Sequence, residues 1–497
     1  MRSDRKATEE REQRLQAKEA KKNRSGFSKF TKVWALVFLG INLVFGAMLF
    51  LANILATKYL VAAGLVVLLL LLIIFPPLYS YKTKKVQRVL AFILSCLVGG
   101  VYVMGSRYLA GTMDFMSQIT KISSTDEYYV VVRDDDMFNE LGDIAGETVH
   151  AYHSSTSHDE AVEDLKSRVE VEVVDETDIK KTVEDLLSGE TNVILLSSGS
   201  YASYNEENDS FDDYTKILES FKIKRETEDI SKPVSVSKQP FNMYITGIDT
   251  HGTIDVTARS DVNMIATVNP NTRTILLTSI PRDYYVLLTD VETYDKLTHT
   301  GVYGANYTVS TVENLLGIDI NYYVKVNFTT VVTLVDAIGG IDIVSDYTFV
   351  TRGTGFYFEE GLNENVSGEA ALAFARERYA FQDGDFQRNK DQQIVMKAII
   401  DKISQSSVLI GSYTDILGAV EENIEMNMTP DTIKELIRMQ TEDMSAWNIV
   451  SQSIVGPTGE EYCYWIKGYA SVVLQDQESM DQAVEKINAV MAGESIE

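Results

Sequence analysis

The fold of the C-terminal half is decided by three apolar stretches: FNMYITGID (241–249), MIATVNP (264–270) and TILLTSIP (274–281). Each stretch is short and is bounded by polar or turn residues, which is typical of buried strands. Asn269-Pro270-Asn271, between the second and third stretches, predicts a hairpin turn. NYYVKVNF (321–328) and IDIVSD (341–346) predict two further strands of the same core.

Helical periodicity fills most of the sequence between and after these strands. The helical patterns cover 309–316, 329–337, 366–377, 388–405, 412–424, 429–440 and 476–491. Strands interleaved with helices indicate an α/β or α+β core, and we expect an α/β domain with a mixed sheet. EYCYWIKG (461–468) predicts one more strand region, so we assign the whole of 238–497 to one domain.

A smaller domain is predicted over 123–225. Its strands are EYYVVVRD (127–134), VEVEVV (169–174) and NVILLSS (192–198), and its helices are expected over 159–168, 177–188 and 211–221. This alternation predicts a small α/β accessory domain with a parallel or mixed sheet. The polar segment 222–239, which contains Pro233, is interpreted as a linker.

Three long apolar runs, 33–54, 59–79 and 89–106, precede these domains. A membrane-spanning helix needs about 20 apolar residues, so we expect three transmembrane helices over 33–110. Residues 1–32 hold 11 basic and 5 acidic residues, and the loop 81–88 is also basic. Because basic loops stay in the cytoplasm, the N-terminus is predicted inside and the chain after about residue 111 outside.

The net charge of −27 hides a division between two parts of the chain. Residues 1–110 carry a charge of +12 and residues 111–497 a charge of −39. The basic stretch 1–32 is interpreted as a cytoplasmic tail that touches anionic membrane lipid rather than as a DNA-binding arm, and no nucleic-acid partner is expected. Cys96 and Cys463 lie on different sides of this division, so no disulfide is expected. The histidines show no metal-ligand spacing, and those at 150, 153 and 158 are interpreted as part of a solvated loop.

Polar side chains collect at the ends of the predicted elements of the larger domain. They are Asp249, Arg259, Asp261, Arg282, Asp283, Arg376, Arg378, Asp385, Arg388 and Gln392. In open α/β sheets ligands gather at such ends, and arginine is the preferred side chain for phosphate. Carboxylates among the arginines suit Mg²⁺ bound jointly by protein and phosphate oxygens. Surface ion pairs are the alternative for each arginine alone, but together they favour a site for a polyanion.

Four segments in order, RSD (259–261), SIPRDYYV (279–286), ALAFARERY (371–379) and GDFQRNKDQQ (384–393), resemble the signature segments of the LytR-CpsA-Psr family. A basic tail, membrane spans and an outer domain match the family's architecture. Three spans and an accessory domain resemble its CpsA-type members, which are associated with capsule assembly. The resemblance is strongest over 238–405.

The resemblance implies a membrane-anchored phosphotransferase that moves a glycopolymer, such as capsular polysaccharide or a teichoic-acid-like polymer, from a polyprenyl-pyrophosphate carrier to peptidoglycan. It implies Mg²⁺ as cofactor, held by Asp249 and Asp261. It also implies a pyrophosphate clamp made by Arg259, Arg282, Arg376, Arg378, Arg388 and Gln392. Other capsule-assembly proteins are possible partners. Phosphoryl transfer needs mainly positioning and charge neutralisation, which such a set supplies.

Several roles stay open at this point. Asp283 and Asp385 are the nearest carboxylates for a general base, although Asp283 could instead orient Arg282. Lys296 and Asn306 could face the acceptor sugar. Candidates for a lipid tunnel are Val331, Val332, Leu334, Val335, Ile399 and Ile400. Two other functions are compatible with the sequence: hydrolysis of the same lipid pyrophosphate, and non-catalytic regulation of the cell envelope as a transcriptional attenuator.

Overall fold

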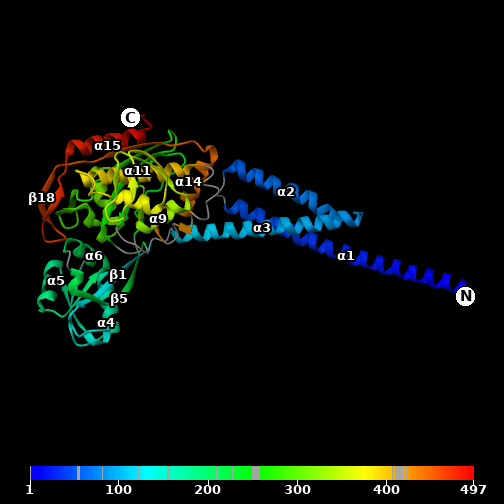
Figure 1. Ribbon diagram of the computed structural model, residues 1–497, viewed down its shortest axis with the longest axis horizontal. Helices are drawn as coiled ribbons and strands as arrows, with labels where there is room; N and C mark the ends of the chain where they lie inside the picture. Colours follow the sequence, from blue (N-terminus) through cyan, green and yellow to red (C-terminus); the bar gives the residue numbers. More distant parts are fainter. Residues whose placement is uncertain are drawn as a thin grey trace. The chain divides into compact units, whose positions relative to one another are not determined.

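The computed structural model describes the chain except for residues 1, 53–55, 81, 120–122, 154–156, 209–210, 227, 249–253, 255–257, 406–407, 409–415, 417, 420–422 and 497 (Figure 1). Within the described chain, only the backbone is described for 2–25, 112–119, 123–124, 206–207 and 225–226. The chain forms two compact units. One comprises Met1–Phe115 and Ile437–Asp443, and the other comprises Met116–Leu436 and Met444–Glu497.

The first unit contains the helices α1 (Arg2–Ala52), α2 (Thr57–Tyr79) and α3 (Lys85–Ile119). Each contains a stretch long and apolar enough to cross a membrane: Gly26–Ala52, Thr57–Tyr79 and Lys85–Gly111. Many large apolar side chains on all three helices are exposed. Apolar exposure on this scale is unfavourable in water and is expected where lipid surrounds a helix. The three spans predicted from the sequence are therefore present as helices.

The accessory domain is built on a five-stranded sheet with the order β3-β2-β4-β1-β5. Its strands are β1 (Ser123–Arg133), β2 (Thr148–Tyr152), β3 (Glu172–Glu176), β4 (Val193–Ser197) and β5 (Thr215–Glu226). β2 pairs in parallel with β3 and β4, whereas β1 pairs antiparallel with β4 and β5. Its helices are α4 (His158–Arg168), α5 (Ile179–Ser188), α6 (Ser198–Glu207) and α7 (Phe211–Tyr214), with a 3₁₀ turn, η1 (Leu141–Ile144). The sheet is mixed, one of the two forms expected.

The helix predicted over 211–221 is wrong beyond Tyr214. Only α7 is helical, and β5 follows at once and continues into the segment interpreted as a linker. β5 pairs along its whole length with β1, from Thr215 opposite Arg133 to Glu226 opposite Ser123. The ladder has 11 residue pairs with one irregularity at Leu218, and this tertiary pairing overrides the weak helical pattern.

The larger domain is built on a six-stranded sheet with the order β16-β11-β6-β7-β8-β17. Its strands are β6 (Phe241–Ile248), β7 (Ser260–Asn269), β8 (Thr274–Ser279), β11 (Tyr322–Val326), β16 (Ile424–Met426) and β17 (Asn448–Ser453). β6, β7 and β8 form an antiparallel meander, and β7 and β8 are joined at the predicted Asn269-Pro270-Asn271 turn. β11 and β17 add in parallel at the two sides of the meander, and β16 pairs antiparallel with β11. The fold is the mixed-sheet α/β fold expected from the sequence.

Helices cover both faces of this sheet. Tyr244 and Ile265 point to the face packed by α8 (Ala305–Leu316) and α15 (Gln477–Ala492). Ile245 and Met264, their neighbours in the chain, point to the other face, packed by α11 (Gly384–Ser404) and α14 (Pro430–Asp443). Because successive strand residues point to opposite faces, strands buried on both sides are apolar throughout.

A smaller apolar cluster lies beside α11 and supports the helices α9 (Phe328–Ala337) and α10 (Gly368–Arg376). Four short strands belong to this region: β12 (Ile341–Ser345), β13 (Phe349–Val350), β14 (Tyr357–Phe358) and β15 (Gly361–Val366). The helix predicted over 412–424 falls mostly outside the described residues, and Ile424 begins β16.

The remaining elements are β9 (Tyr285–Leu288), β10 (Thr293–Lys296), the 3₁₀ segment η2 (Leu297–Tyr303), β18 (Thr458–Cys463) and β19 (Gly468–Val473). Trp465, at the turn between β18 and β19, is completely buried. It shares an apolar cluster with Val302 and with the accessory-domain residues Val131, Tyr152 and Leu186. The accessory domain and the larger domain therefore share a core at this hairpin.

One carboxylate is buried in the middle of α11. Asp391 is 1% exposed, and its Oδ1 accepts a hydrogen bond from Gln387 Nε2 at 2.9 Å. Burial raises the pKa of Asp391 to about 7; the Gln387 hydrogen bond lowers it, and the charge of Asp346 raises it further. The folded protein therefore favours the protonated form of this side chain.

The raised pKa predicts a pH-dependent stability. Below the unfolded pKa of about 4, Asp391 is protonated in both states and does not reduce the free energy of unfolding. As the pH rises to about 7, the unfolded chain gains stability by ionising this side chain, so the free energy of unfolding falls. Over that interval the free energy of unfolding of the wild type should fall by up to about 4 kcal/mol relative to the Asp391→Asn variant. Urea denaturation of the full chain in detergent, at several pH values, measures this difference. The exposed Asp481→Asn variant is the control and should track the wild type; equal pH dependence in all three proteins would contradict the prediction.

Candidate functional site

A cavity of about 650 Å³ opens at the end of the large sheet where β6, β8 and β11 finish. The ends of β6 and β11, the start of β7, α9, α10 and α11 all contribute to its wall. The carboxyl ends of strands are the usual ligand-binding edge of an open α/β sheet. The sheet thus places this cavity where the sequence predicts a ligand.

The cavity is apolar along one part and cationic along another. The apolar part includes Ile245, Ile248, Met264, Phe328, Val331, Leu372, Met396 and Ile399. The cationic part includes Arg282, Arg352, Arg376, Arg378 and Arg388. Such a lining suits a ligand with a hydrocarbon part and an anionic part.

The helix α11 contributes to both parts through a single stripe. Arg388, Gln392, Val395 and Ile399 all line the cavity and follow one another at intervals of four, three and four residues. Residues at this spacing lie on one face of a helix. The composition of the stripe changes along the helix from charged, through polar, to apolar. The order of residues in one helix therefore sets the polarity gradient of the cavity wall.

Asp261 owes its position to an irregularity between β6 and β7. Gly247 pairs with Val262 and Ile248 pairs with Ser260, so Asp261 is an extra residue between two paired positions. A β-bulge of this kind bends the strand and redirects a side chain. Here the redirected side chain lines the cavity.

Buried hydrogen bonds hold the backbone on both sides of the bulge. The Ser260 hydroxyl lies 2.6 Å from Thr246 Oγ1 and donates to Asn263 Oδ1 at 2.7 Å, and Asn263 Nδ2 donates to the Ser260 carbonyl at 2.8 Å. Behind this segment lies Gly301, where a Cβ atom would come within 2.5 Å of the Ala258 carbonyl oxygen and the Ser260 nitrogen. A side chain at position 301 would push the RSD segment out of place. The network thus fixes the segment that carries Arg259 and Asp261.

Asp261 is the charge around which the arginines gather. Its Oδ2 accepts a hydrogen bond from Arg282 Nη1 at 3.1 Å, and its Oδ1 accepts one from Thr298 Oγ1 at 2.8 Å. Burial alone would raise the pKa of Asp261, but Arg282, Arg259 and the Thr298 hydroxyl hold it below its ordinary value. Asp261 is therefore ionised, with acceptor oxygens only.

Three arginines gather around Asp261, and Asp283 and Asp385 lie beside them. Burial lowers the pKa of Arg259 and of Arg388, and the positive charge of Arg282 contributes to lowering both. The pKa of Arg282 is raised, because Asp261, Asp283 and Asp385 outweigh the effect of burial. Arginine stays protonated in proteins, so the lowered pKa values of Arg259 and Arg388 express a cost of burying these charges, to which repulsion from Arg282 adds. A bound anion would relieve that cost.

The loop after α10 is organised by the buried carboxylate of Glu377, which is 4% exposed. One of its oxygens accepts hydrogen bonds from the backbone nitrogens of Arg378, Tyr379 and Ala380, and the other accepts one from the backbone nitrogen of Arg352. Arg378 and Arg352 both lie over the Tyr379 ring, at 4.8 and 4.6 Å from its centre. Glu377 thus holds the backbone that presents two of the cavity's arginines.

The structure brings most of the predicted site residues together. Asp261, Arg282, Arg376, Arg378, Arg388 and Gln392 line the cavity. Arg259 is buried beside them and interacts with Asp261 and Arg282. Asp249, the other predicted metal ligand, lies outside the described residues.

The residues with open roles separate into three groups. Asp283 pairs with Lys296 Nζ at 3.3 Å and with Arg282 Nε at 3.7 Å, which favours an orienting role. Asp385 pairs with Arg388 at 3.1 Å and is largely exposed. Asn306 donates instead to the Glu228 carbonyl at 2.7 Å and does not join the described lining of the cavity.

The tunnel candidates divide in a similar way. Val331 and Ile399 line the cavity. The others are absent from its described lining: Leu334 and Val335 belong to the apolar cluster beside α11, Ile400 packs under the sheet, and Val332 lies on α9.

Sequence reasoning missed Arg352, Thr298 and Glu377. Arg352 lies in a turn with no strong strand or helix pattern beside it, and Thr298 lies in a 3₁₀ segment. Glu377 stands in the ARERY segment between Arg376 and Arg378, and the sequence alone indicates a phosphate-binding role only for the two arginines. A carboxylate between two arginines, just after a helix, was the available signal for a side chain that organises their backbone.

Comparison with known proteins shows which family this chain belongs to. Residues 200–488 match the LytR_cpsA_psr family. The polyisoprenyl-teichoic acid–peptidoglycan teichoic acid transferase TagU of Bacillus anthracis is 33% identical over 259 residues, which are 52% of this chain and 83% of that protein. TagU of Enterococcus faecalis is 34% identical over 253 residues, 50% of this chain and 80% of that protein. The crystal structure of TagV of B. subtilis is 28% identical, with a TM-score of 0.44 over 52% of this chain and 99% of that one. The chain belongs to the LytR_cpsA_psr family.

Proposed function

We propose that the chain is a phosphotransferase that moves a glycopolymer from a polyprenyl-pyrophosphate carrier to peptidoglycan. The observation that carries the proposal is the cavity whose lining combines an apolar wall with five arginines gathered near Asp261. The names of the similar TagU proteins, which describe transfer of teichoic acid from a polyisoprenyl carrier to peptidoglycan, support the same reaction. The polymer is capsular polysaccharide or a teichoic-acid-like glycan.

The reaction follows from where the two parts of the donor would bind. The prenyl chain lies against Val331, Leu372 and Ile399, and the pyrophosphate lies among the arginines. A hydroxyl oxygen of peptidoglycan attacks the phosphorus next to the glycan, the phosphoanhydride P–O bond breaks, and prenyl monophosphate leaves with the bonding electrons. The hydroxyl proton passes to solvent water, and a phosphodiester joins glycan and peptidoglycan. Arg282 and Arg388 neutralise the charge that builds up on the phosphate oxygens.

Magnesium fits the chemistry of the Asp261 carboxylate. An ionised carboxylate at the cationic end of the cavity is a hard oxygen ligand, and Mg²⁺ is commonly bound by one or two carboxylates together with phosphate oxygens. We infer that Asp261 holds the ion, with Asp249 as the second carboxylate. When bound, Mg²⁺ would add positive charge against the pyrophosphate.

We further propose that the N-terminus is cytoplasmic and that residues 111–497 are extracytoplasmic. The support is the excess of basic residues in 1–32 and 81–88 and the odd number of apolar helices between the tail and the domains. The reaction requires this orientation, because peptidoglycan lies outside the cytoplasmic membrane.

The arginine clamp predicts a large loss of transfer in the Arg282→Ala variant. Losing one preorganised charge at a developing oxyanion costs about a hundredfold or more in rate. The full chain in detergent is given Mg²⁺, a lipid-pyrophosphate glycan and peptidoglycan fragments, and the phosphodiester-linked product is measured. The Arg168→Ala variant, at an accessory-domain arginine paired with Asp164, is the control and should keep full activity.

Three outcomes would contradict parts of this proposal. Equal product from the wild type and the Arg282→Ala variant would exclude the clamp. Release of phosphorylated glycan without linkage to peptidoglycan would indicate the hydrolase instead. Full activity after removal of divalent ions by a chelator would exclude the role of Mg²⁺; we expect activity to vanish and to return when Mg²⁺ alone is added back.

The apolar wall predicts a dependence on the length of the donor's prenyl chain. A Val331→Trp substitution places a large ring where the cavity is apolar, so transfer from a long-chain donor should fall by about tenfold or more. Transfer from a donor with a chain of two prenyl units should fall much less. The Val350→Trp variant, at a half-exposed position outside the described lining of this cavity, is the control. Equal loss with both donors would show that the chain does not lie along this wall.

The orientation predicts which part of the chain a protease can reach. In protoplasts, whose membrane is intact, an added protease should degrade residues 111–497 and leave an epitope placed before residue 32 untouched. Protection of the C-terminal domains, with cleavage only after the membrane is permeabilised, would reverse the topology.

A further inference from the structure

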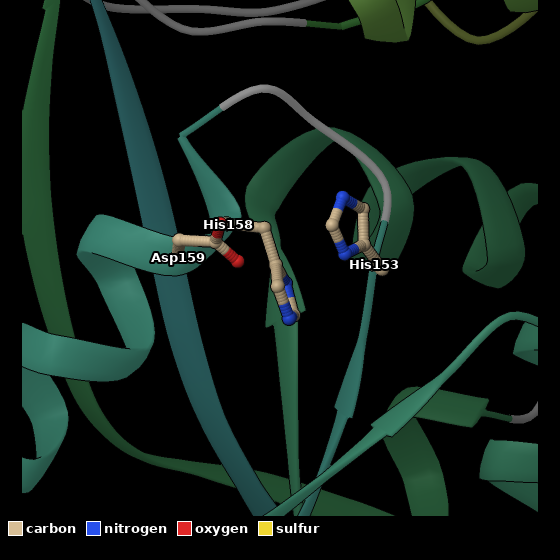
Figure 2. A group of neighbouring side chains, drawn as sticks. All are labelled: His153, His158 and Asp159. Carbon is tan, nitrogen blue, oxygen red and sulfur yellow. The ribbon is translucent and has the colours of Figure 1, made fainter.

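Three potential metal ligands meet in the accessory domain, outside the arginine-lined cavity. His153 follows the last residue of β2, and His158 and Asp159 are the first residues of α4 (Figure 2). Each offers one ligand atom, and these atoms lie within 4.8 Å of one another. The figure shows His158 between the other two side chains. The sequence predicted that the histidines at 150, 153 and 158 lie in a solvated loop. That prediction is wrong for His158, which is only 1% exposed.

The buried imidazole of His158 has one nitrogen bound and one available. Its Nε2 lies 2.9 Å from Asp175 Oδ1, and its Nδ1 has no hydrogen-bond partner among the described residues. Because Nε2 faces a carboxylate, it carries the proton of the neutral ring, and Nδ1 presents a lone pair. A buried nitrogen without a partner is unusual in a folded protein. A purely packing role for His158 would account for the Asp175 contact but not for Nδ1.

The chain around these ligands is held from several sides. Ser157, which precedes His158, donates a hydrogen bond to the buried Asp126, and the Tyr128 hydroxyl lies 3.1 Å from the Ser157 oxygen. The backbone nitrogen of His153 donates to the Glu176 carbonyl at 2.8 Å. These contacts place the start of α4 and the end of β2 independently of any ion, as a preorganised site requires.

His153 and Asp159 are exposed and can complete a site around the fixed nitrogen. The His153 and His158 rings lie 4.2 Å apart between centres, with an angle of 29° between their planes. The two exposed side chains can rotate about their own bonds without moving the backbone, so their ligand atoms can adjust around the buried ring. Because His153 and Asp159 are exposed, solvent reaches this side of the cluster, and a water molecule can supply a fourth ligand.

We propose that His153, His158 and Asp159 bind a divalent first-row transition ion, with Zn²⁺ the best match. Two imidazoles and a carboxylate form a ligand set that Zn²⁺ takes in tetrahedral geometry, with water in the fourth position. Asp175 is a positioning residue: its Oδ1 accepts the hydrogen bond from Nε2–H of His158, the arrangement found behind most metal-bound histidines. The site joins β2 to α4 and is distinct from the magnesium proposed at Asp261.

The test measures Zn²⁺ retained by the full chain in detergent, purified without a polyhistidine tag. After incubation with Zn²⁺ and gel filtration, the wild type should retain about one equivalent by mass spectrometry, and a competing chelator then gives the affinity. The His153→Ala and Asp159→Asn variants should bind at least about tenfold more weakly, and the Asp175→Asn variant about 10–100-fold more weakly. Both ligand variants change exposed side chains, so their thermal unfolding without metal should match the wild type.

The control is the His150→Ala variant. His150 is a nearby imidazole whose Nδ1 lies 2.9 Å from Glu176 Oε1, and it is not part of the cluster. It should retain Zn²⁺ like the wild type. Binding of Co²⁺ with the visible absorption of a tetrahedral site, lost in the His153→Ala variant, would also support the proposal. Absence of retained Zn²⁺ in the wild type, or equal retention by the wild type and both ligand variants, would overturn it.

Discussion

The site depends on one electrostatic constraint: several arginines must be held close together around the buried carboxylate of Asp261. Arg259, Arg282 and Arg388 all act on Asp261, and Arg282 also acts on the other two arginines. Burying these charges and holding like charges at short range are both costly, even with Asp283 and Asp385 paired to Arg282 and Arg388. The surrounding structure has to supply the missing stability. It does so through neutral hydrogen bonds at Ser260 and Asn263 and through the carboxylate of Glu377, which binds backbone rather than arginine side chains.

The same constraint explains why the cavity is suited to an anion with a hydrocarbon tail. The arginines lie at one part of a wall whose other part is apolar, and α11 carries the transition along a single face. A small soluble anion would satisfy the charges but leave the apolar wall in contact with water. A neutral lipid would cover the wall but leave the charges without a partner. Only a ligand with both parts satisfies both requirements.

Sequence patterns predicted β6, β7, β8 and β11 of the large sheet because those strands are largely buried on both faces and therefore read as apolar runs. They did not predict β16 and β17, which are less buried. Several arginines could be picked out because they follow such runs directly, as Arg282 follows TILLTSIP. The failures have a common cause. β5 exists because β1 pairs with it along its whole length, Arg352 reaches the cavity from a turn, and His158 is buried by a sheet that brings Asp175 to it. Each depends on contacts between segments distant in the sequence, which local periodicity does not contain.

Because a bulge redirects Asp261, the site is also sensitive to the number of residues between Ser260 and Val262. Val262 and Ser260 keep partners on β6, and Asp261 is the one residue between them that is not needed for pairing. Loss of that residue would leave Ser260 and Val262 as chain neighbours opposite Ile248 and Gly247, which is the register of a regular ladder. The carboxylate at the centre of the charges would disappear, and the Ser260–Asn263 hydrogen bonds that span the bulge would have to change. A one-codon deletion therefore acts on the charge cluster and its supporting network, while β6 and β7 still have residues to pair.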